Sequence, residues 1–290
     1  MRDQDMATDA IKYQADVDLD RRNSSHTLLH ELAAECGHGL SILEVGCSSG
    51  YLGESLVDKG HRVTGVEPEP ASAAAAARVL PEVWNGGLED YLAAHPAAMF
   101  DVLLFGDVLE HMVDPVEALQ RALRHLRPGG SVVISLPNIA HGSVRAMLLE
   151  GRFDYAERGI LDRTHLRFFT RDGVAALLAD AGLALERLYA VGQPLEDVDR
   201  DYGMRLNREQ ITAVELLDDD ATRHAFQYVL RARPATAQGR MLLTQNLSIP
   251  AEYPVAMPRV RGARSLSQRL QAWMFRALLK SISARRFRGK

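Results

Sequence analysis

A turn of small residues is the first feature of the sequence that points to chemistry. It runs Gly46-Cys47-Ser48-Ser49-Gly50 and follows the apolar run 42–45. Small residues let the backbone approach a ligand closely, and a helix that starts after such a turn offers it free N–H groups. Glu67 stands 21 residues after Gly46, where a carboxylate is suited to accept hydrogen bonds from both hydroxyls of a ribose. An ordinary strand-to-helix turn has a similar composition, so the turn alone leaves both interpretations open.

A second concentration of reactive side chains lies in residues 137–170, which are rich in histidine, arginine, aspartate and aromatic residues. A histidine with a pKa of about 6.5 can accept a proton from a reacting hydroxyl. His165 is the first candidate for this general base, with Asp162 as the carboxylate that orients it, and His141 is the second candidate. The alternative is that His165 only holds the loop in place through hydrogen bonds to backbone carbonyls.

The elements that position these residues follow from the alternation of apolar runs with helix-compatible segments, which predicts βαβ units and a parallel sheet. We expect strands at about 42–46, 61–66, 83–85, 101–105, 131–136, 183–190 and 225–232, and helices at about 25–36, 51–59, 71–79, 114–126 and 171–181. The run Arg127-Pro128-Gly129-Gly130 predicts a tight turn. Ligands of such sheets bind beyond the carboxyl ends of the strands, where both groups of reactive residues fall.

The composition is that of a soluble globular protein, with 290 residues of which 47% are hydrophobic and 25% charged. No apolar run approaches the ~18 residues of a membrane span, and the polar, acidic start of the chain does not resemble a signal peptide. Two cysteines, Cys36 and Cys47, are too few for a disulfide framework or a four-cysteine zinc site. We therefore expect a cytoplasmic protein.

Five short motifs, taken in order, resemble those of class I S-adenosylmethionine-dependent methyltransferases. They are residues 43–50, Glu67, and residues 100–105, 106–111 and 126–130. The resemblance is closest to the ubiquinone-biosynthesis-like O-methyltransferases of bacteria and extends from about Tyr13 to Arg233. It implies a Rossmann-like α/β fold with a doubly wound, mostly parallel seven-stranded sheet, S-adenosylmethionine as the cofactor, and methyl transfer as the activity.

The same resemblance implies a set of cofactor-binding positions. They are Glu44, Gly46, Cys47, Ser48, Gly50, Glu67, Pro68, Gly87, Leu88, Asp107 and Val108. Many family members carry aspartate where Gly87 stands, so the backbone of Leu88, or Glu89, is the expected substitute contact to the adenine. For Glu44, a cap on neighbouring backbone N–H groups is the alternative interpretation. In similar sugar and quinol O-methyltransferases a histidine beside a carboxylate is the base, which favours His165.

The predicted organisation is one domain with appendages. Residues 1–20 form an N-terminal arm, and residues 21–235 form the methyltransferase domain. Within that domain, residues 137–170 and 191–224 are predicted acceptor-binding insertions, because function often lies in irregular loops. Residues 236–290 are a linker and a basic amphipathic tail.

The expected reaction is O-methylation of a hydroxyl on a small molecule or glycan. The alternatives are N-methylation of an amino sugar or similar amine, and a non-catalytic protein that binds S-adenosylmethionine as a partner. The glycines of the turn together with Glu67 disfavour the second alternative, and Ser48 disfavours a nicotinamide oxidoreductase.

No metal is expected. A His-Glu-x-x-His pattern is absent, and the spacing of Asp107, Glu110, His111 and Asp114 matches no common zinc or calcium loop.

Charge is distributed unevenly along the chain. Residues 253–290 contain ten basic and no acidic residues, whereas residues 1–252 contain 24 basic and 38 acidic residues. The acidic body argues against nucleic-acid binding. Apolar residues from Leu266 to Ile282 recur at helical spacing, so the tail, residues 259–290, predicts a basic amphipathic helix. Such a helix suits peripheral contact with an anionic membrane, and the alternative is docking on the acidic body or on a second subunit of a homo-oligomer.

Overall fold

The computed structural model describes residues 17–217 and 221–235. The predicted tail, and the predicted arm up to residue 16, lie outside the described residues. None of the helices in the described ranges has the length and apolarity to span a bilayer.

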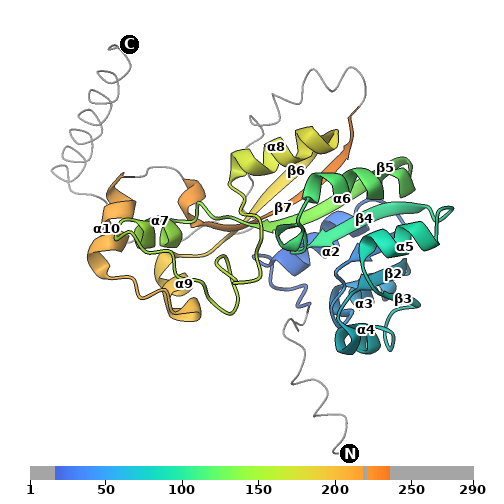
Figure 1. Ribbon diagram of the computed structural model, residues 1–290, viewed down its shortest axis with the longest axis horizontal. Helices are drawn as coiled ribbons and strands as arrows, with labels where there is room; N and C mark the ends of the chain where they lie inside the picture. Colours follow the sequence, from blue (N-terminus) through green and yellow to red (C-terminus); the bar gives the residue numbers. More distant parts are fainter. Residues whose placement is uncertain (1–16, 218–220, 236–290) are drawn as a thin grey trace, which may run out of the picture.

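Seven strands form one sheet in the order β3-β2-β1-β4-β5-β7-β6 (Figure 1). Neighbours from β3 to β5 pair in parallel, and β7 runs antiparallel to both β5 and β6. The strands are β1 (Ser41–Val45), β2 (Arg62–Glu67), β3 (Glu82–Asn85), β4 (Phe100–Gly106), β5 (Leu126–Pro137), β6 (Leu183–Gly192) and β7 (Ala225–Pro234). The predicted doubly wound, mostly parallel seven-stranded sheet is confirmed.

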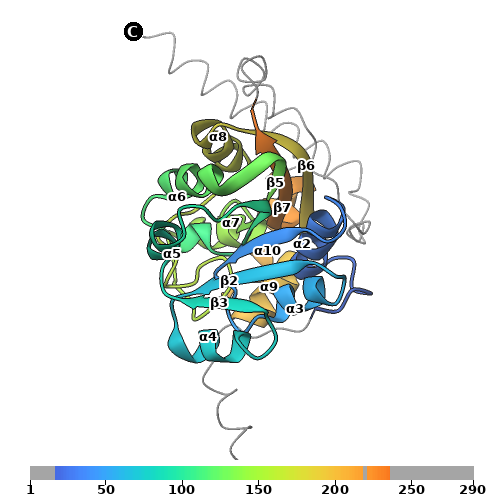
Figure 2. The same cartoon turned by 90° about the vertical axis from the view of Figure 1, so that its right-hand side faces the viewer.

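Helices cover both faces of the sheet (Figure 2). One face carries α2 (Ser25–Ala34), α3 (Tyr51–Val57) and α4 (Pro70–Ala76), and the other carries α5 (Leu88–Ala94), α6 (Pro115–Ala122) and α8 (Arg171–Ala181). The side chains of the central strand β4 alternate between these two helical layers. Val102 and Leu104 pack toward α2, α3 and α4, and Leu103 and Phe105 pack toward α5, α6 and α8. All four side chains are fully buried, so the strand is apolar on both faces, as parallel strands between two helical layers must be.

Capping residues explain why helix starts were predictable. Asp114 accepts a hydrogen bond from the N–H of Glu117 at 2.9 Å, and Pro115 occupies the first position of α6. Thr170 caps α8 in the same way through the N–H of Gly173.

The predicted tight turn at 127–130 is wrong, because these residues belong to β5. The pairing of β4 with β5 slips there, from Phe100 opposite Leu126 to Val102 opposite Ser131. Gly129 has a φ of +83°, so the run forms an irregularity within a continuing strand.

A separate helical layer projects from the carboxyl edge of the sheet, and it was not predicted as helical. It comprises α7 (Gly142–Leu148), α9 (Leu195–Tyr202) and α10 (Arg208–Leu217). In Figure 1 it lies to one side of the sheet, away from α3, α4 and α5. Its helices pack on one another through small clusters of their own, among them Val144, Met147 and Val198. We call α7, α9, α10 and the intervening segment 149–169 the lid.

Candidate functional site

Three strand ends meet at one edge of the sheet and define the site. Val45 at the end of β1 pairs with Val66 of β2 on one side and with Phe105 of β4 on the other. The segments that follow these strands therefore lie together, which brings the small-residue turn next to Glu67 and Asp107.

The glycines of the turn are required by its geometry. Gly46 has a φ of +70°, and a Cβ there would lie 2.8 Å from the Cγ2 of Val108. Gly50 has a φ of +85°, and a Cβ would lie 2.9 Å from the Cγ2 of Val79. Ser48 also adopts a positive φ, of 50°. The turn is thus a compact cradle of backbone in which side chains have no room.

Glu67 is buried and held by backbone on both sides. Its Oε2 accepts a hydrogen bond from the N–H of Ser48 at 2.9 Å, and its Oε1 accepts one from the N–H of Glu69 at 2.9 Å. Each carboxylate oxygen has a second lone pair, so the fixed carboxylate retains acceptor capacity for ribose hydroxyls. The cradle and the oriented carboxylate fit the adenosyl part of the expected cofactor.

The rim beside Glu67 carries the other positions that were expected to lie near the adenine. Pro68 is exposed, and Gly87 and Leu88 start α5, with Leu88 turned into the core. Asn85, which no sequence pattern singled out, donates from Nδ2 to the carbonyls of Glu67 and Pro68 at 3.0 and 3.3 Å. It ties the end of β3 to the end of β2 and fixes this rim.

Two of the expected cofactor positions, Glu44 and Cys47, have buried side chains. Glu44 lies under α3 against Gly53, and burial, with the N–H of Gly53 opposing it and the charge of Glu67 adding to it, raises its pKa to about 8. The Cys47 thiol points into the core against Gly65, and burial raises its pKa. Both side chains are therefore buried within the protein, and the hydrogen bond of Glu44 with the N–H of Gly53 agrees with the alternative of a backbone cap.

Asp107 is the electrostatic centre of the site. Its φ is 52°, and its N–H donates to Ser135 Oγ at 3.0 Å while that hydroxyl donates back to Asp107 Oδ1 at 2.7 Å. Gln227 of β7 also donates to Oδ1. The charge of Asp107 influences groups from five segments: His26, Tyr51, Glu110, His165 and Tyr202. Residues of α2, of the start of α3, of the segment after β4 and of the lid therefore lie within reach of the charge of this carboxylate.

The pair His26 and Tyr51 closes the site from the side of α2. His26 Nε2 and the Tyr51 hydroxyl are 3.3 Å apart, and the two rings meet edge to face at 5.1 Å. Tyr51 directly follows the cradle, so this contact joins α2 to it. Burial lowers the pKa of His26, and the charge of Asp107 opposes that shift.

His165 reaches the site from the loop before α8 and is 9% exposed. Its Nδ1 donates to the carbonyl of Ile160 at 3.0 Å, so in this tautomer Nε2 carries the lone pair. Burial lowers its pKa, and the neighbouring His111 lowers it further, against the opposing effects of Ile160, Asp162 and Asp107. A neutral imidazole with a defined tautomer is the form in which histidine accepts a proton.

Asp162 holds the turn that leads to His165, and its backbone carbonyl accepts a hydrogen bond from the N–H of His165 at 3.0 Å. Its Oδ1 accepts hydrogen bonds from the N–H and hydroxyl of Thr164, at 2.8 and 2.7 Å. The group that fixes the His165 ring is the carbonyl of Ile160, and Asp162 acts on the ring through its charge.

His141 is a structural residue and not a second base. It is fully buried, its Nδ1 accepts from the N–H of Ser143, and its Nε2 donates to the carbonyl of Gln193 at 2.9 Å. Both nitrogens are therefore engaged, and burial lowers the pKa to about 4. Because Gln193 belongs to the second insertion, His141 links the two insertions inside the lid.

A candidate metal-binding cluster appears where the sequence predicted none. Donor atoms of Glu110, His111 and His165 lie within 4.8 Å of one another. Glu110 Oε2 is buried and has no hydrogen-bond partner among residues 17–217 and 221–235. Both histidines donate Nδ1–H to backbone carbonyls, of Thr164 and Ile160, an arrangement that orients imidazole ligands. His111 and His165 are 54 positions apart in the sequence, so no short motif records this cluster.

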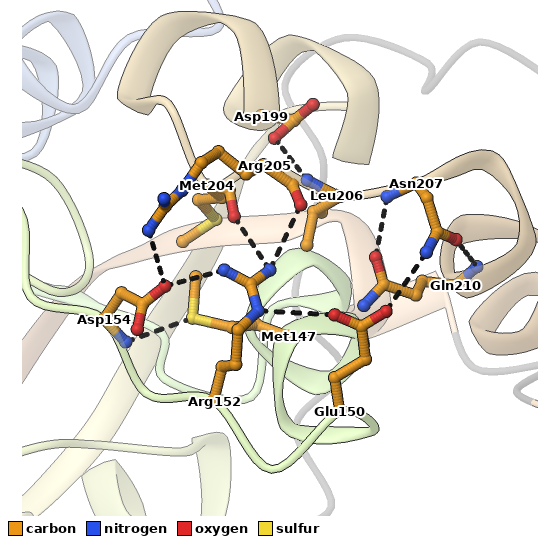
Figure 3. Close-up of polar contacts among 10 residues, drawn as sticks. All are labelled: Met147, Glu150, Arg152, Asp154, Asp199, Met204, Arg205, Leu206, Asn207 and Gln210. Atoms are coloured by element: carbon orange, nitrogen blue, oxygen red, sulfur yellow. Dashed lines mark hydrogen bonds and ion pairs between the residues drawn. The ribbon is translucent and has the colours of Figure 1, made fainter.

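The lid contains a pocket of about 90 Å³ between residues 147–161 and 202–205. Arg152 fixes one wall of it (Figure 3). Its guanidinium donates to Asp154 at 2.6 Å and to the carbonyls of Met204 and Arg205 at 3.2 and 3.1 Å. The two predicted insertions thus form a single structure.

Comparison with known proteins identifies the family. A family model described as a methyltransferase domain matches residues 17–188. A ubiquinone biosynthesis O-methyltransferase from Pseudomonas paraeruginosa is 28% identical over 188 residues, covering 59% of this chain and 79% of the relative. A probable S-adenosylmethionine-dependent methyltransferase from Mycolicibacterium smegmatis is 27% identical over 190 residues, covering 64% and 69%.

Solved structures show the same fold at low identity. A complex of the Haloferax volcanii Trm112 methyltransferase activator with a putative methyltransferase includes a chain that matches with a TM-score of 0.51 and 18% identity, over 74% of this chain and 91% of that one. Magnesium protoporphyrin IX methyltransferase from Synechocystis, solved with bound S-adenosylhomocysteine, matches with a TM-score of 0.50 and 14% identity, over 80% and 94%. The matched family model spans more than half of the chain, and the cradle with Glu67 fits the cofactor of that family. The chain belongs to the methyltransferase-domain family and is an S-adenosylmethionine-dependent methyltransferase.

Proposed function

We propose that the enzyme methylates a hydroxyl on a small molecule or glycan and that His165 removes the proton of that hydroxyl. The observation that carries the proposal is the state of His165. It is buried, neutral, and within reach of the charge of Asp107, and its Nδ1 is held on the Ile160 carbonyl, which leaves Nε2 as the basic nitrogen. The O-methyltransferase relatives, at 28% identity, support the same acceptor chemistry.

The positions of the residues suggest which of them bind the cofactor, which enclose the acceptor and which accepts the proton. When bound, S-adenosylmethionine supplies an electrophilic methyl group on sulfur. The cradle and Glu67 hold the adenosyl part, and Gly46, Asp107 and Val108 line the strand ends next to it. The lid encloses the acceptor and excludes water, which strengthens the electrostatic effect of Asp107. As the hydroxyl oxygen becomes an ether, its proton passes to His165 Nε2, and the resulting imidazolium is stabilised by Asp107 and Asp162.

A second candidate role for His165 is metal binding together with Glu110 and His111. A divalent ion there would lower the pKa of a bound acceptor hydroxyl, and no separate base would be needed. Dialysis against EDTA distinguishes the roles. Turnover that is lost and then restored by one divalent metal supports metal binding, and unchanged turnover supports the base alone.

The acceptor atom is tested by incubating a metabolite pool with methyl-labelled S-adenosylmethionine and identifying the labelled product. A methyl group on oxygen supports the proposal, and a methyl group on nitrogen supports the N-methyltransferase alternative. Binding of S-adenosylhomocysteine without any labelled product supports a non-catalytic partner protein.

A further inference from the structure

The pocket in the lid has an unequal balance of charge. Its one carboxylate, Asp154, is matched by two guanidinium groups, since Arg152 and Arg205 approach it to 2.6 and 3.3 Å (Figure 3). Arg158 also lines the pocket and forms no ion pair within the described ranges. The lining therefore presents positive charge in a body whose residues 1–252 are acidic overall, with 24 basic and 38 acidic residues.

Tyr202 connects this pocket with the reaction centre. Its ring lies against Gly159, where a Cβ would be 2.5 Å from Tyr202 Cδ1, and stacks on Phe226 at a centroid distance of 5.4 Å. The phenol lies within the electrostatic reach of both Arg158 and Asp107. Burial raises its pKa, so the hydroxyl keeps its proton and can donate a hydrogen bond.

The remaining walls are apolar and the space is small. Met147, Ile160 and Leu161 form the buried side. A volume of about 90 Å³ corresponds to about three water molecules at ~30 Å³ each, which is enough for one carboxylate or phosphate group with its attachment carbon.

We propose that this pocket binds an anionic group of the acceptor, a carboxylate or a phosphate, through Arg158 and the hydroxyl of Tyr202. The inference rests on the proposed function and adds a substrate class to it: an acceptor that carries a hydroxyl at the reaction centre and a negative charge on the side of the lid. A guanidinium matches the oxygens of either anion, and the tyrosine hydroxyl adds a directional donor.

The test uses full-length protein saturated with S-adenosylhomocysteine and three small probes: benzoate, phenyl phosphate and the neutral benzyl alcohol. Ligand-observed NMR titration gives the affinity of each. We expect one or both anions to bind at least about fivefold more tightly than benzyl alcohol, and Arg158→Gln to remove that preference. Tyr202→Phe should weaken the anion by a smaller factor.

Arg163→Gln is the matched control, because Arg163 lies on the same segment, is paired with Glu157, and does not line the pocket. A preference for benzoate or for phenyl phosphate supports the proposal and identifies which anion fits. Equal affinity for all three probes, or an equal loss in Arg158→Gln and Arg163→Gln, overturns it. Failure of S-adenosylhomocysteine to bind would instead contradict the cofactor site on which the proposed function stands.

Discussion

The cofactor edge and the lid both lie within reach of the charge of Asp107, but the first is held together mainly by backbone contacts and the second mainly by side-chain contacts. The cofactor edge is shaped by the backbone. Three adjacent strand ends meet there, the turn has positive φ at Gly46, Ser48 and Gly50, and two backbone N–H groups hold the Glu67 carboxylate. The lid is held together by side-chain contacts: Arg152 and His141 each form hydrogen bonds to residues about 50 positions away in the sequence. A backbone cradle suits one invariant cofactor, whereas side chains can be exchanged to suit an acceptor.

The largest effect is expected at the junction of the two regions. His165→Ala should lower turnover by about 10²–10⁴-fold and leave the affinity for S-adenosylhomocysteine unchanged, because the base acts on the acceptor. Single-turnover kinetics and calorimetry measure the two quantities. Near-parent turnover in this variant would mean that no base at position 165 is needed.

Within the lid, His141→Ala should lower the free energy of unfolding by about 2–4 kcal/mol, since it leaves Ser143 and the Gln193 carbonyl without their partner. The pKa of His141 is about 4 in the folded protein and about 6.5 when unfolded, so its neutral form stabilises the fold above pH 6.5 and that stabilisation is lost as the pH falls toward 4. Denaturant unfolding of parent and variant should therefore differ most above pH 6.5. A difference that grows as the pH falls would argue against a neutral His141.

At the cofactor edge, Glu67→Ala should weaken S-adenosylhomocysteine binding by roughly tenfold to a hundredfold, the loss of about 1.5–3 kcal/mol of hydrogen bonding. Calorimetry measures the change. Glu82→Ala is the control, because that carboxylate starts β3 at the opposite edge of the sheet and pairs with the exposed Arg62. Unchanged binding in Glu67→Ala would remove Glu67 from the cofactor site.

Gly46→Ala tests whether the cradle has room for a side chain. The new Cβ would approach Val108, so we expect a loss of about 1–3 kcal/mol in stability together with weaker cofactor binding. Gly129→Ala has a similar φ, of +83°, with no atom within 4 Å of its Cβ position, and therefore isolates the backbone strain. If thermal unfolding is shifted equally by both substitutions, the contact with Val108 is unimportant.

Removal of the tail, residues 259–290, is expected to have the smallest effect on the stability and cofactor binding of the methyltransferase domain. We propose that residues 259–290 bind an anionic membrane surface, at about 1 kcal/mol per basic residue near the surface. Full-length protein should then sediment with phosphatidylglycerol vesicles, less so in high salt and not after truncation at Pro258. Protein that stays in the supernatant at low salt would indicate docking on the body or on a second subunit.

The sequence predicted which segments meet at the cofactor edge, because each of them directly follows a strand. The turn, Glu67 and the Asp107 segment each follow a strand directly, and parallel pairing alone brings them together. The spacing of the motif did not show burial: Glu44 and Cys47 belong to the same motif as the glycines, but their side chains are buried in the core.

For the lid, the sequence predicted where the insertions lie in the chain but not their helices or their contacts. Its helices have seven to ten residues, and its contacts join residues distant in sequence, such as Arg152 with Met204 and His111 with His165. No single-segment pattern records such pairs. His141 and His165 look alike in sequence, and only their hydrogen bonds separate a structural histidine from a candidate base.

The pH dependence of single-turnover methyl transfer tests most directly the central claim, that a neutral His165 takes the proton of the acceptor. Because the pKa of His165 is lowered and the neutral form is active, the rate of the parent enzyme should be level at high pH and fall as the pH drops through a value below 6.5. The inflection should be absent from the residual rate of His165→Ala. A parent profile without an inflection, or an inflection that persists unchanged in His165→Ala, would contradict the claim.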